Sequence, residues 1–228
     1  MNKLILCIES STEICSVALF FGDQMISIAE NKEGNKHSEI ITILIQKCLD
    51  QANKDIAKLD AVAVSLGPGS YTSLRVGMST AKGLCYALNK PLITISSLDI
   101  LALGTIQNMD VSDKTLVIPM IDARRMEVYT AVYNHLGEKI HPENAIILDS
   151  EFINSIKTPL QKIIVAGNGG SKFKANFHQE NIFYASFETS AAMMGKEAFH
   201  RFHSKQFENT AYTVPNYFKA PNITQPKK

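Results

Sequence analysis

The sequence predicts a mixed α/β protein, because three short strands at the start of the chain are followed by alternating helices and strands. The opening apolar segments are separated by polar turns, which is typical of antiparallel strands. Further along, apolar residues recur at three- and four-residue spacing, as on a helix that buries one face. Continuous apolar runs separate these helical stretches, an alternation that belongs to the mixed α/β class.

The first block of elements contains five strands and two helices. We predict strands at 4–8, 15–21 and 24–30, a helix at 37–52, a strand at 60–66, a helix at 71–88 and a strand at 92–95. Ser38 is the expected cap of the first helix. Ile40 and Ile43 widen the apolar surface of that helix beyond one stripe, and Pro91 ends the second helix.

The second block repeats no sequence pattern of the first. We predict a helix at 98–107, strands at 116–121, 128–133, 145–148 and 163–166, and a helix at 190–203. The connection at 108–114 is the predicted boundary between an N-terminal lobe at 1–107 and a C-terminal lobe at 108–228. The tail at 221–228 is expected to fray.

Composition excludes several classes of protein. The 228 residues are 45% hydrophobic, with 23 Lys and Arg against 22 Asp and Glu, so the formal net charge of +1 argues against a surface built for nucleic acid. The sequence has no run of about 18 apolar residues that could span a membrane, and its N-terminal apolar stretch is too short for a signal peptide. We therefore expect no membrane association. The four cysteines lack CxxC spacing, which favours buried reduced thiols and a cytoplasmic location.

The segment at 65–75, Ser-Leu-Gly-Pro-Gly-Ser-Tyr-Thr-Ser-Leu-Arg, carries the strongest chemical signal. Its glycines fall at a predicted strand-to-helix turn, where backbone amides can approach a ligand and the helix N-terminus favours anions. It is not a P-loop, because Lys is absent and the spacing differs. Phosphate binding and a tight turn with a helix cap both remain open, and the turn is the commoner case.

Small residues follow on the next helix. Ser73, Gly77 and Ala81 stand four residues apart on one face, and Gly77 and Gly83 each cost about 1 kcal/mol relative to Ala inside a helix. Close packing of another backbone usually offsets such a cost. That backbone could belong to the helix at 37–52, to a second protein, or to both.

Other chemistry is weakly indicated. His200 and His203 lie three residues apart on a predicted helix, where a solvated face is favoured over a metal site. An isolated acidic residue such as Glu9 is more often the last residue of a strand than part of a ligand site. A Ser/His/Asp triad has no GxSxG elbow to support it, and no protease nucleophile is recognisable.

Taken together, six segments resemble one family, TsaB (also called YeaZ). They include Ile-Glu-Ser-Ser-Thr-Glu-Ile-Cys-Ser-Val-Ala-Leu at 8–19, His-Ser-Glu at 37–39, Gly-Pro-Gly-Ser-Tyr-Thr-Ser-Leu-Arg-Val-Gly at 67–77 and Ile-Asp-Ala-Arg-Arg-Met-Glu-Val-Tyr at 121–129, besides 81–84 and 96–98. Weaker matches lie at 167–169 and 214–218. The long glycine-containing segment followed by the Asp-Ala-Arg segment is specific.

The resemblance implies an actin-like ATPase (ASKHA, RNase H-like) fold of two lobes, with mixed sheets flanked by helices. It implies a non-catalytic subunit that activates a TsaD-type transferase, with a TsaE-type ATPase, to form N6-threonylcarbamoyladenosine (t6A) on ANN-decoding tRNAs. ATP and metal are then expected in the partner subunits, and this chain is expected to require no cofactor and to contact tRNA only indirectly, through the complex. The family's TsaD-type partner holds its metal on a His-x-x-x-His motif, and no two histidines here are four residues apart.

Family members pair through helices of the N-terminal lobe, with the TsaD-type partner or with a second copy. On this chain those helices are the ones at 37–52 and 71–88, and pairing would bury the excess apolar surface. The residues that we expect in the interface are Ile41, Leu44, Ile45, Cys48, Ser73, Gly77 and Ala81.

Two positions depart from the family pattern: Glu9 stands where Asp is usual, and Ser73 where Gly is usual. A carboxylate one methylene longer would misplace a metal-bound water, so ATP hydrolysis by this lobe is not expected. The residues that would form a vestigial phosphate loop are Glu9, Ser10, Gly67, Gly69, Ser70 and Thr72.

A different class of function stays as the alternative: a nucleotide-dependent phosphotransferase or hydrolase of the actin-like superfamily. It would use Glu9, the turn at 67–72 and Asp122. Basic side chains could also reach tRNA phosphates, although solvated or ion-paired side chains are the default; these are Arg75, Lys82, Arg124 and Arg125.

Overall fold

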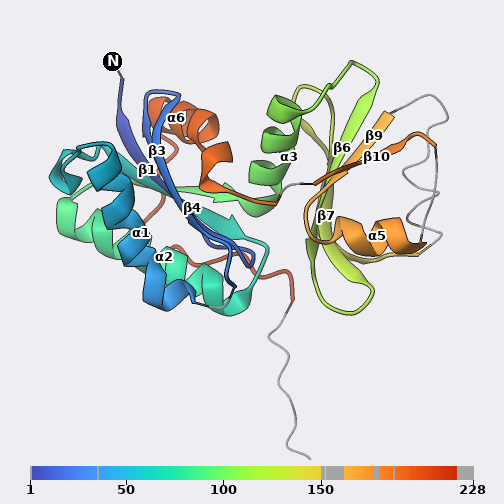
Figure 1. The fold of residues 1–228 in the computed structure, drawn as a ribbon, viewed down its shortest axis with the longest axis horizontal. Coiled ribbons are helices and arrows are strands. Elements are labelled where there is room, and N and C mark those ends of the chain that lie inside the picture. Colours follow the sequence, from blue (N-terminus) through green and yellow to red (C-terminus); the bar gives the residue numbers. More distant parts are fainter. Residues whose placement is uncertain are drawn as a thin grey trace, which may run out of the picture.

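The computed structural model describes residues 2–34, 36–149, 152, 162–176, 180–186 and 188–219. These form two five-stranded sheets in two halves of the molecule (Figure 1). The first sheet has the order β3-β2-β1-β4-β5, with bounds β1 Leu4–Glu9, β2 Cys15–Phe21, β3 Gln24–Asn31, β4 Ala61–Gly67 and β5 Leu92–Ser96. The second has the order β10-β9-β6-β7-β8, with bounds β6 Thr115–Asp122, β7 Glu127–Tyr133, β8 Lys139–Ile147, β9 Lys162–Ala166 and β10 Ile182–Ala185.

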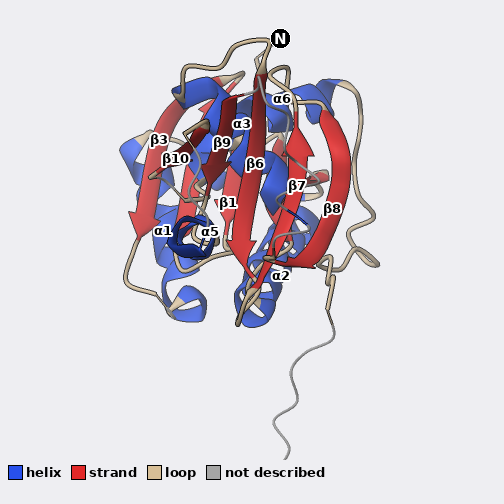
Figure 2. Ribbon diagram, turned by 90° about the vertical axis from the view of Figure 1, so that its right-hand side faces the viewer, coloured by secondary structure: helices blue, strands red, loops and turns tan. Residues whose placement is uncertain are grey.

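Both sheets have the same pairing, which the sequence did not reveal. In the first, β1 is antiparallel to β2 and parallel to β4; in the second, β6 is antiparallel to β7 and parallel to β9. The outer strands also correspond, since β3 and β8 are antiparallel edges whereas β5 and β10 are parallel edges. Figure 2 looks onto the second sheet, with β6 at its centre.

Strand β1 is buried on both faces because each face supplies a separate core. Leu4, Leu6 and Ile8 point to the side of the helices α1 (His37–Gln51) and α2 (Tyr71–Leu88). Ile5 and Cys7 point to the opposite side, where α6 (Gly195–His203) and a short 3₁₀ turn at Ala191–Met193 cover the sheet. This two-residue alternation follows from the pleat of a strand.

Helix α3 (Ser97–Asn108) lies between the two sheets, and α5 (Gly170–Asn176) covers the second (Figure 1). Helix α6 comes late in the chain but packs on β1 and β5 of the first sheet. A split of the chain at residue 108 therefore does not separate the two halves completely, and the lobe bounds 1–107 and 108–228 stay a prediction.

Most predicted elements are present within one or two residues, with five differences. Helix α1 begins at His37 after Lys36, so Ser38 lies in the first turn and is not the cap. Strand β8 begins at Lys139, where the sequence predicted residue 145, and the predicted helix at 190–203 is a 3₁₀ turn followed by α6. Helix α5 and strand β10 were not predicted; both are short and lack a strong apolar period.

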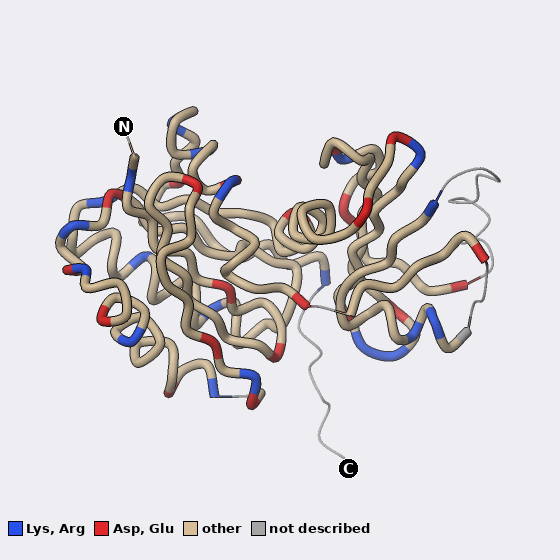
Figure 3. The backbone as a smooth tube through the Cα atoms, turned by 45° about the horizontal axis from the view of Figure 1, so that its top comes forward, with Lys and Arg blue, Asp and Glu red and all other residues tan. Residues whose placement is uncertain are grey.

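Two composition-based expectations can be compared with the described residues. All four cysteines are free and buried, as predicted: Cys7, Cys15, Cys48 and Cys85. No described helix combines enough length and apolar character to cross a lipid bilayer. Lys and Arg are interspersed with Asp and Glu over both halves of the molecule (Figure 3).

The two glycines of α2 should respond oppositely to the same substitution. A Cβ at Gly77 would lie 2.1 Å from Ser10 Oγ and 3.1 Å from Ser10 Cβ, whereas a Cβ at Gly83 would meet nothing within 4 Å. We expect Gly77→Ala to lower the free energy of unfolding by about 1–2 kcal/mol, because overpacking strains the contact. Gly83→Ala should raise it by about 0.5–1 kcal/mol through helix propensity. Urea unfolding followed by circular dichroism measures both, and shifts of equal sign would contradict this packing.

Candidate functional site

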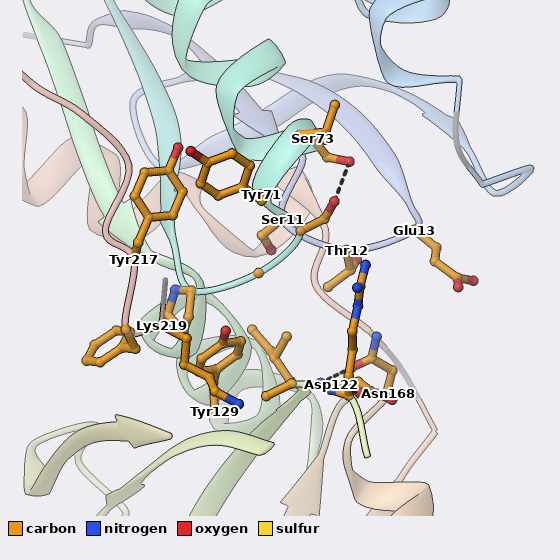
Figure 4. A pocket seen from close by; sticks show the side chains of 18 of the residues that line it. Ser11, Thr12, Glu13, Tyr71, Ser73, Asp122, Tyr129, Asn168, Tyr217 and Lys219 are labelled. Carbon is orange, nitrogen blue, oxygen red and sulfur yellow. Dashed lines mark hydrogen bonds between the residues drawn. The ribbon is translucent and has the colours of Figure 1, made fainter. Parts of the chain in front are cut away.

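A cleft of about 630 Å³ lies between the two halves of the molecule (Figure 4). Its first wall consists of the loop after β1 and the turn between β4 and α2. Its second wall consists of the loop between β6 and β7, with Asn168 and Lys172 beside it. Residues 216–219, near the end of the described chain, complete the lining.

The loop after β1 is held from below by a buried carboxylate. The Ser11 amide donates to Glu9 Oε1 at 2.6 Å, and the Ser10 amide donates to Ser65 Oγ at 3.2 Å. Glu9 is fully buried, and its Oε2 has no hydrogen-bond partner among the described residues. Burial raises the pKa of Glu9 from 4.5 to about 7, against the opposing effect of the neighbouring donors of Ser11, Ser65 and Ser10.

The turn between β4 and α2 packs directly on that loop. Gly67 has φ +105°, a left-handed conformation that glycine adopts without strain. A Cβ at Gly69 would lie 2.2 Å from the Ser11 carbonyl oxygen, and the Ser70 amide donates to that same oxygen at 2.7 Å. Gly69 is therefore required by the close approach of the Ser11 backbone, and this contact aims the N-terminus of α2 at the cleft.

A short chain of polar side chains follows the first turn of α2. Ser70 Oγ lies 2.9 Å from Ser73 Oγ, which lies 3.5 Å from His37 Nδ1 at the start of α1. Burial lowers the pKa of His37, so its imidazole is neutral at pH 7. Ser11 also lines the cleft, and its buried Oγ has no partner among the described residues.

The second wall carries a paired carboxylate and two arginines. Asp122 accepts from Lys172 Nζ at 2.6 Å and from the Arg124 amide at 2.5 Å, and its own amide donates to Asn168 Oδ1 at 2.8 Å. Arg124 and Arg125 have φ of +68° and +51°, an uncommon conformation for residues other than glycine. Their side chains are exposed at the cleft.

Comparison with known proteins identifies the family. The family model described as "TsaD: tRNA N6-adenosine threonylcarbamoyltransferase" matches residues 28–225. The "tRNA threonylcarbamoyladenosine biosynthesis protein TsaB" of Bacillus subtilis is 31% identical over 75% of this chain and 73% of its own length. The TsaB protein of Buchnera aphidicola subsp. Schizaphis graminum is 30% identical, over 81% of this chain and 89% of its own length. The chain belongs to the TsaB (YeaZ) family.

Other TsaB relatives match over a shorter region. The proteins of Buchnera aphidicola subsp. Acyrthosiphon pisum and Haemophilus influenzae are 37% and 34% identical, but the matched region spans only 58% and 52% of their lengths. The structure of YeaZ from Pseudomonas aeruginosa superposes with a TM-score of 0.77 at 25% identity, covering 94% of this chain and 99% of that one. These comparisons confirm the two-lobe actin-like α/β fold that the resemblance implied.

The phosphate-loop residues predicted for this TsaB-family chain divide into two groups. Gly69, Ser70 and Thr72 line the cleft. Glu9, Ser10 and Gly67 lie beneath its floor, so the Glu9 carboxylate is covered by the loop that it supports. Among the described residues, no three His, Cys, Asp or Glu side chains gather as metal ligands would.

The seven residues predicted for the partner interface occupy the inner face of the helices. Five of them belong to the core beneath α1 and α2: Ile41, Leu44, Ile45, Cys48 and Ala81. Ser73 is buried at the edge of the cleft, and Gly77 packs against Ser10. The apolar period marked the side that packs on the sheet, because a helix buries its most apolar stripe in its own core. These seven side chains therefore do not form the exposed surface of α1 and α2.

The cleft wall at 216–219 was not predicted as part of a site. The weak family match at 214–218 was the one sequence signal that pointed to this segment. Two of the four basic residues proposed for phosphate contact are engaged with the same part of the chain: Lys82 donates to the carbonyls of Ala211 and Thr213, and Arg75 donates to Tyr217 Oη.

The raised pKa of Glu9 should make stability depend on pH. The folded state holds this proton up to about pH 7 and the unfolded state only up to about 4.5, so stability from Glu9 is present below pH 4.5 and is lost as the pH rises through 7. Relative to the parent, Glu9→Gln should therefore gain about 2–3 kcal/mol in free energy of unfolding between pH 5 and pH 8. Urea unfolding of both proteins at the two pH values measures this. A constant difference would mean that Glu9 titrates normally.

Proposed function

We propose that this chain is the TsaB-type subunit in t6A formation on ANN-decoding tRNAs and acts by pairing with a TsaD-type transferase. The names of its relatives support the pathway, since they are tRNA threonylcarbamoyladenosine biosynthesis proteins. A TsaE-type ATPase completes the proposed machinery, with ATP and metal held by the partners. This chain contributes a binding surface rather than reacting groups.

The observation that carries the pairing is the outer face of α1 and α2, which lie side by side over the first sheet (Figure 1). Ile43 on α1 is 63% exposed and Tyr86 on α2 is 87% exposed, although both are large and apolar enough to favour burial. Gly83 opens onto free space, so its cost inside the helix is not repaid by a contact within the chain. A partner helix seated there would cover the two side chains and could approach the Gly83 backbone closely.

The placement of Glu9 supports a role without nucleotide hydrolysis. Its carboxylate lies under the cleft floor, holds the Ser11 amide and has a raised pKa. A group that is buried in this way supports a loop and does not face a ligand in the cleft. The departure from Asp to Glu at this position thus agrees with a structural use of the residue.

A second candidate, the nucleotide-dependent phosphotransferase or hydrolase, is favoured by one observation. The N-terminus of α2 faces a cleft with arginines on its other wall, an arrangement suited to anions. Calorimetry of the isolated chain with ATP and magnesium separates the candidates. Tight binding with turnover would support the enzyme, whereas the subunit role expects no turnover.

The central test measures t6A in bulk tRNA by nucleoside mass spectrometry after this protein is depleted from its host. We expect t6A to fall and to be restored by the parent gene. Gly83→Glu should fail to restore it, because a charged side chain would enter the paired helices, while the exposed position leaves the fold intact.

Gln107→Glu is the matched control, since it adds the same side chain at an exposed position of α3, away from α1 and α2. It should restore t6A fully. Sedimentation of the free protein and of its mixture with the TsaD-type partner then shows whether the same face also forms a homodimer. Unchanged t6A after depletion would contradict the proposed pathway.

A further inference from the structure

The chain after α6 runs from the first half of the molecule to the second; we name residues 208–219 the strap. It begins at the edge of the first sheet, where the Glu208 amide donates to the Leu92 carbonyl at 2.9 Å and the Glu208 carboxylate accepts from Thr94 at 3.1 Å. Lys82 of α2 then donates to the carbonyls of Ala211 and Thr213 at 3.1 and 3.0 Å.

The middle of the strap is pinned at the cleft. The Asn216 amide donates to the Leu66 carbonyl at 2.8 Å, at the end of β4. The Tyr217 ring lies 4.6 Å from the Tyr71 ring between centroids, and its hydroxyl accepts from Arg75 Nε at 3.2 Å. Figure 4 shows Tyr217 and Tyr71 with their rings next to each other at the cleft.

The last described residues belong to the second half. The Phe218 ring lies 6.2 Å from the Tyr129 ring on β7, and Lys219 forms an ion pair with Glu127 at the start of the same strand. Because Tyr217 and Lys219 also line the cleft, the strap spans its opening and does not merely end near it.

A second set of contacts joins the two halves through α3. Asp99 accepts from Tyr133 Oη at 2.7 Å and pairs with Lys139 at 3.0 Å, both from the second half. It also lies 3.5 Å from Arg201 on α6, which packs on the first sheet. The halves are therefore tied at α3 and again at the strap.

We propose that the strap is a latch that sets the opening of the cleft, with Tyr217 as its pin on the first half and Lys219 as its anchor on the second. The contacts at α3 act as the fixed hinge. When Tyr217 leaves Tyr71 and Arg75, the Asn216 amide and Lys82 alone hold the strap near α2 and β4. The bridge is then weaker, and the halves separate more often about α3.

The test measures the distance between the halves in the whole chain. The native cysteines are buried, so single exposed cysteines introduced by Thr42→Cys on α1 and Lys174→Cys on α5 can carry spin labels selectively. Pulsed electron paramagnetic resonance should give one narrow distance for the parent. Tyr217→Ala should raise the population at longer distances by about two- to tenfold, the range that corresponds to loss of one aromatic contact.

Tyr212→Ala is the matched control, since Tyr212 lies in the same strap, is 82% exposed and makes no ring contact with the described residues. It should leave the distance unchanged. Lys219→Ala releases the other end of the strap at a partly exposed side chain, so it decides the question if Tyr217→Ala fails to fold. Parent-like distances in folded Lys219→Ala and Tyr217→Ala would overturn the latch.

Discussion

The close approach of the Ser11 carbonyl to Gly69 and Ser70 is the contact on which the cleft and the helical surface both depend. It joins the loop after β1 to the turn after β4, and a side chain at Gly69 would prevent it. The same approach continues along α2, where Gly77 rests on Ser10. Because α2 is thus held close to the first sheet, its N-terminus faces the cleft and its opposite face remains open to a partner.

The two sheets share one strand order but use their central strands differently. Strand β1 ends at Glu9 and β6 ends at Asp122, so an acidic residue closes each central strand. Glu9 is buried and supports the loop above it, whereas Asp122 is exposed and engages Lys172 and Asn168. The acidic residue at the end of the central strand therefore supports a loop in the first half and forms part of a polar cleft wall in the second.

Helix α2 connects the proposed binding surface with the cleft. Gly83 and Tyr86 belong to its exposed face, while Arg75, nearer its start, holds Tyr217 of the strap. A partner on the outer face would therefore contact the same rigid helix that carries one end of the latch. The proposed subunit role and the proposed latch are measured separately, since one concerns t6A and the other the geometry of the free chain.

Local periodicity in the sequence predicted most helices and strands, the lack of CxxC spacing predicted the reduced thiols, and short motifs carried the resemblance to the family. Each of these signals depends on residues close together along the chain. The sequence could not show which faces of α1 and α2 are exposed, because the apolar stripe that identifies a helix is the one that packs in the protein's own core. Ile41 and Gly77 were therefore assigned to a partner interface, whereas Ile43 and Gly83 are the residues that face outward. Tertiary structure also decided the repeated sheet order, the burial of Glu9 and the strap. These arise from contacts between residues far apart in the chain, which spacing along the sequence does not encode.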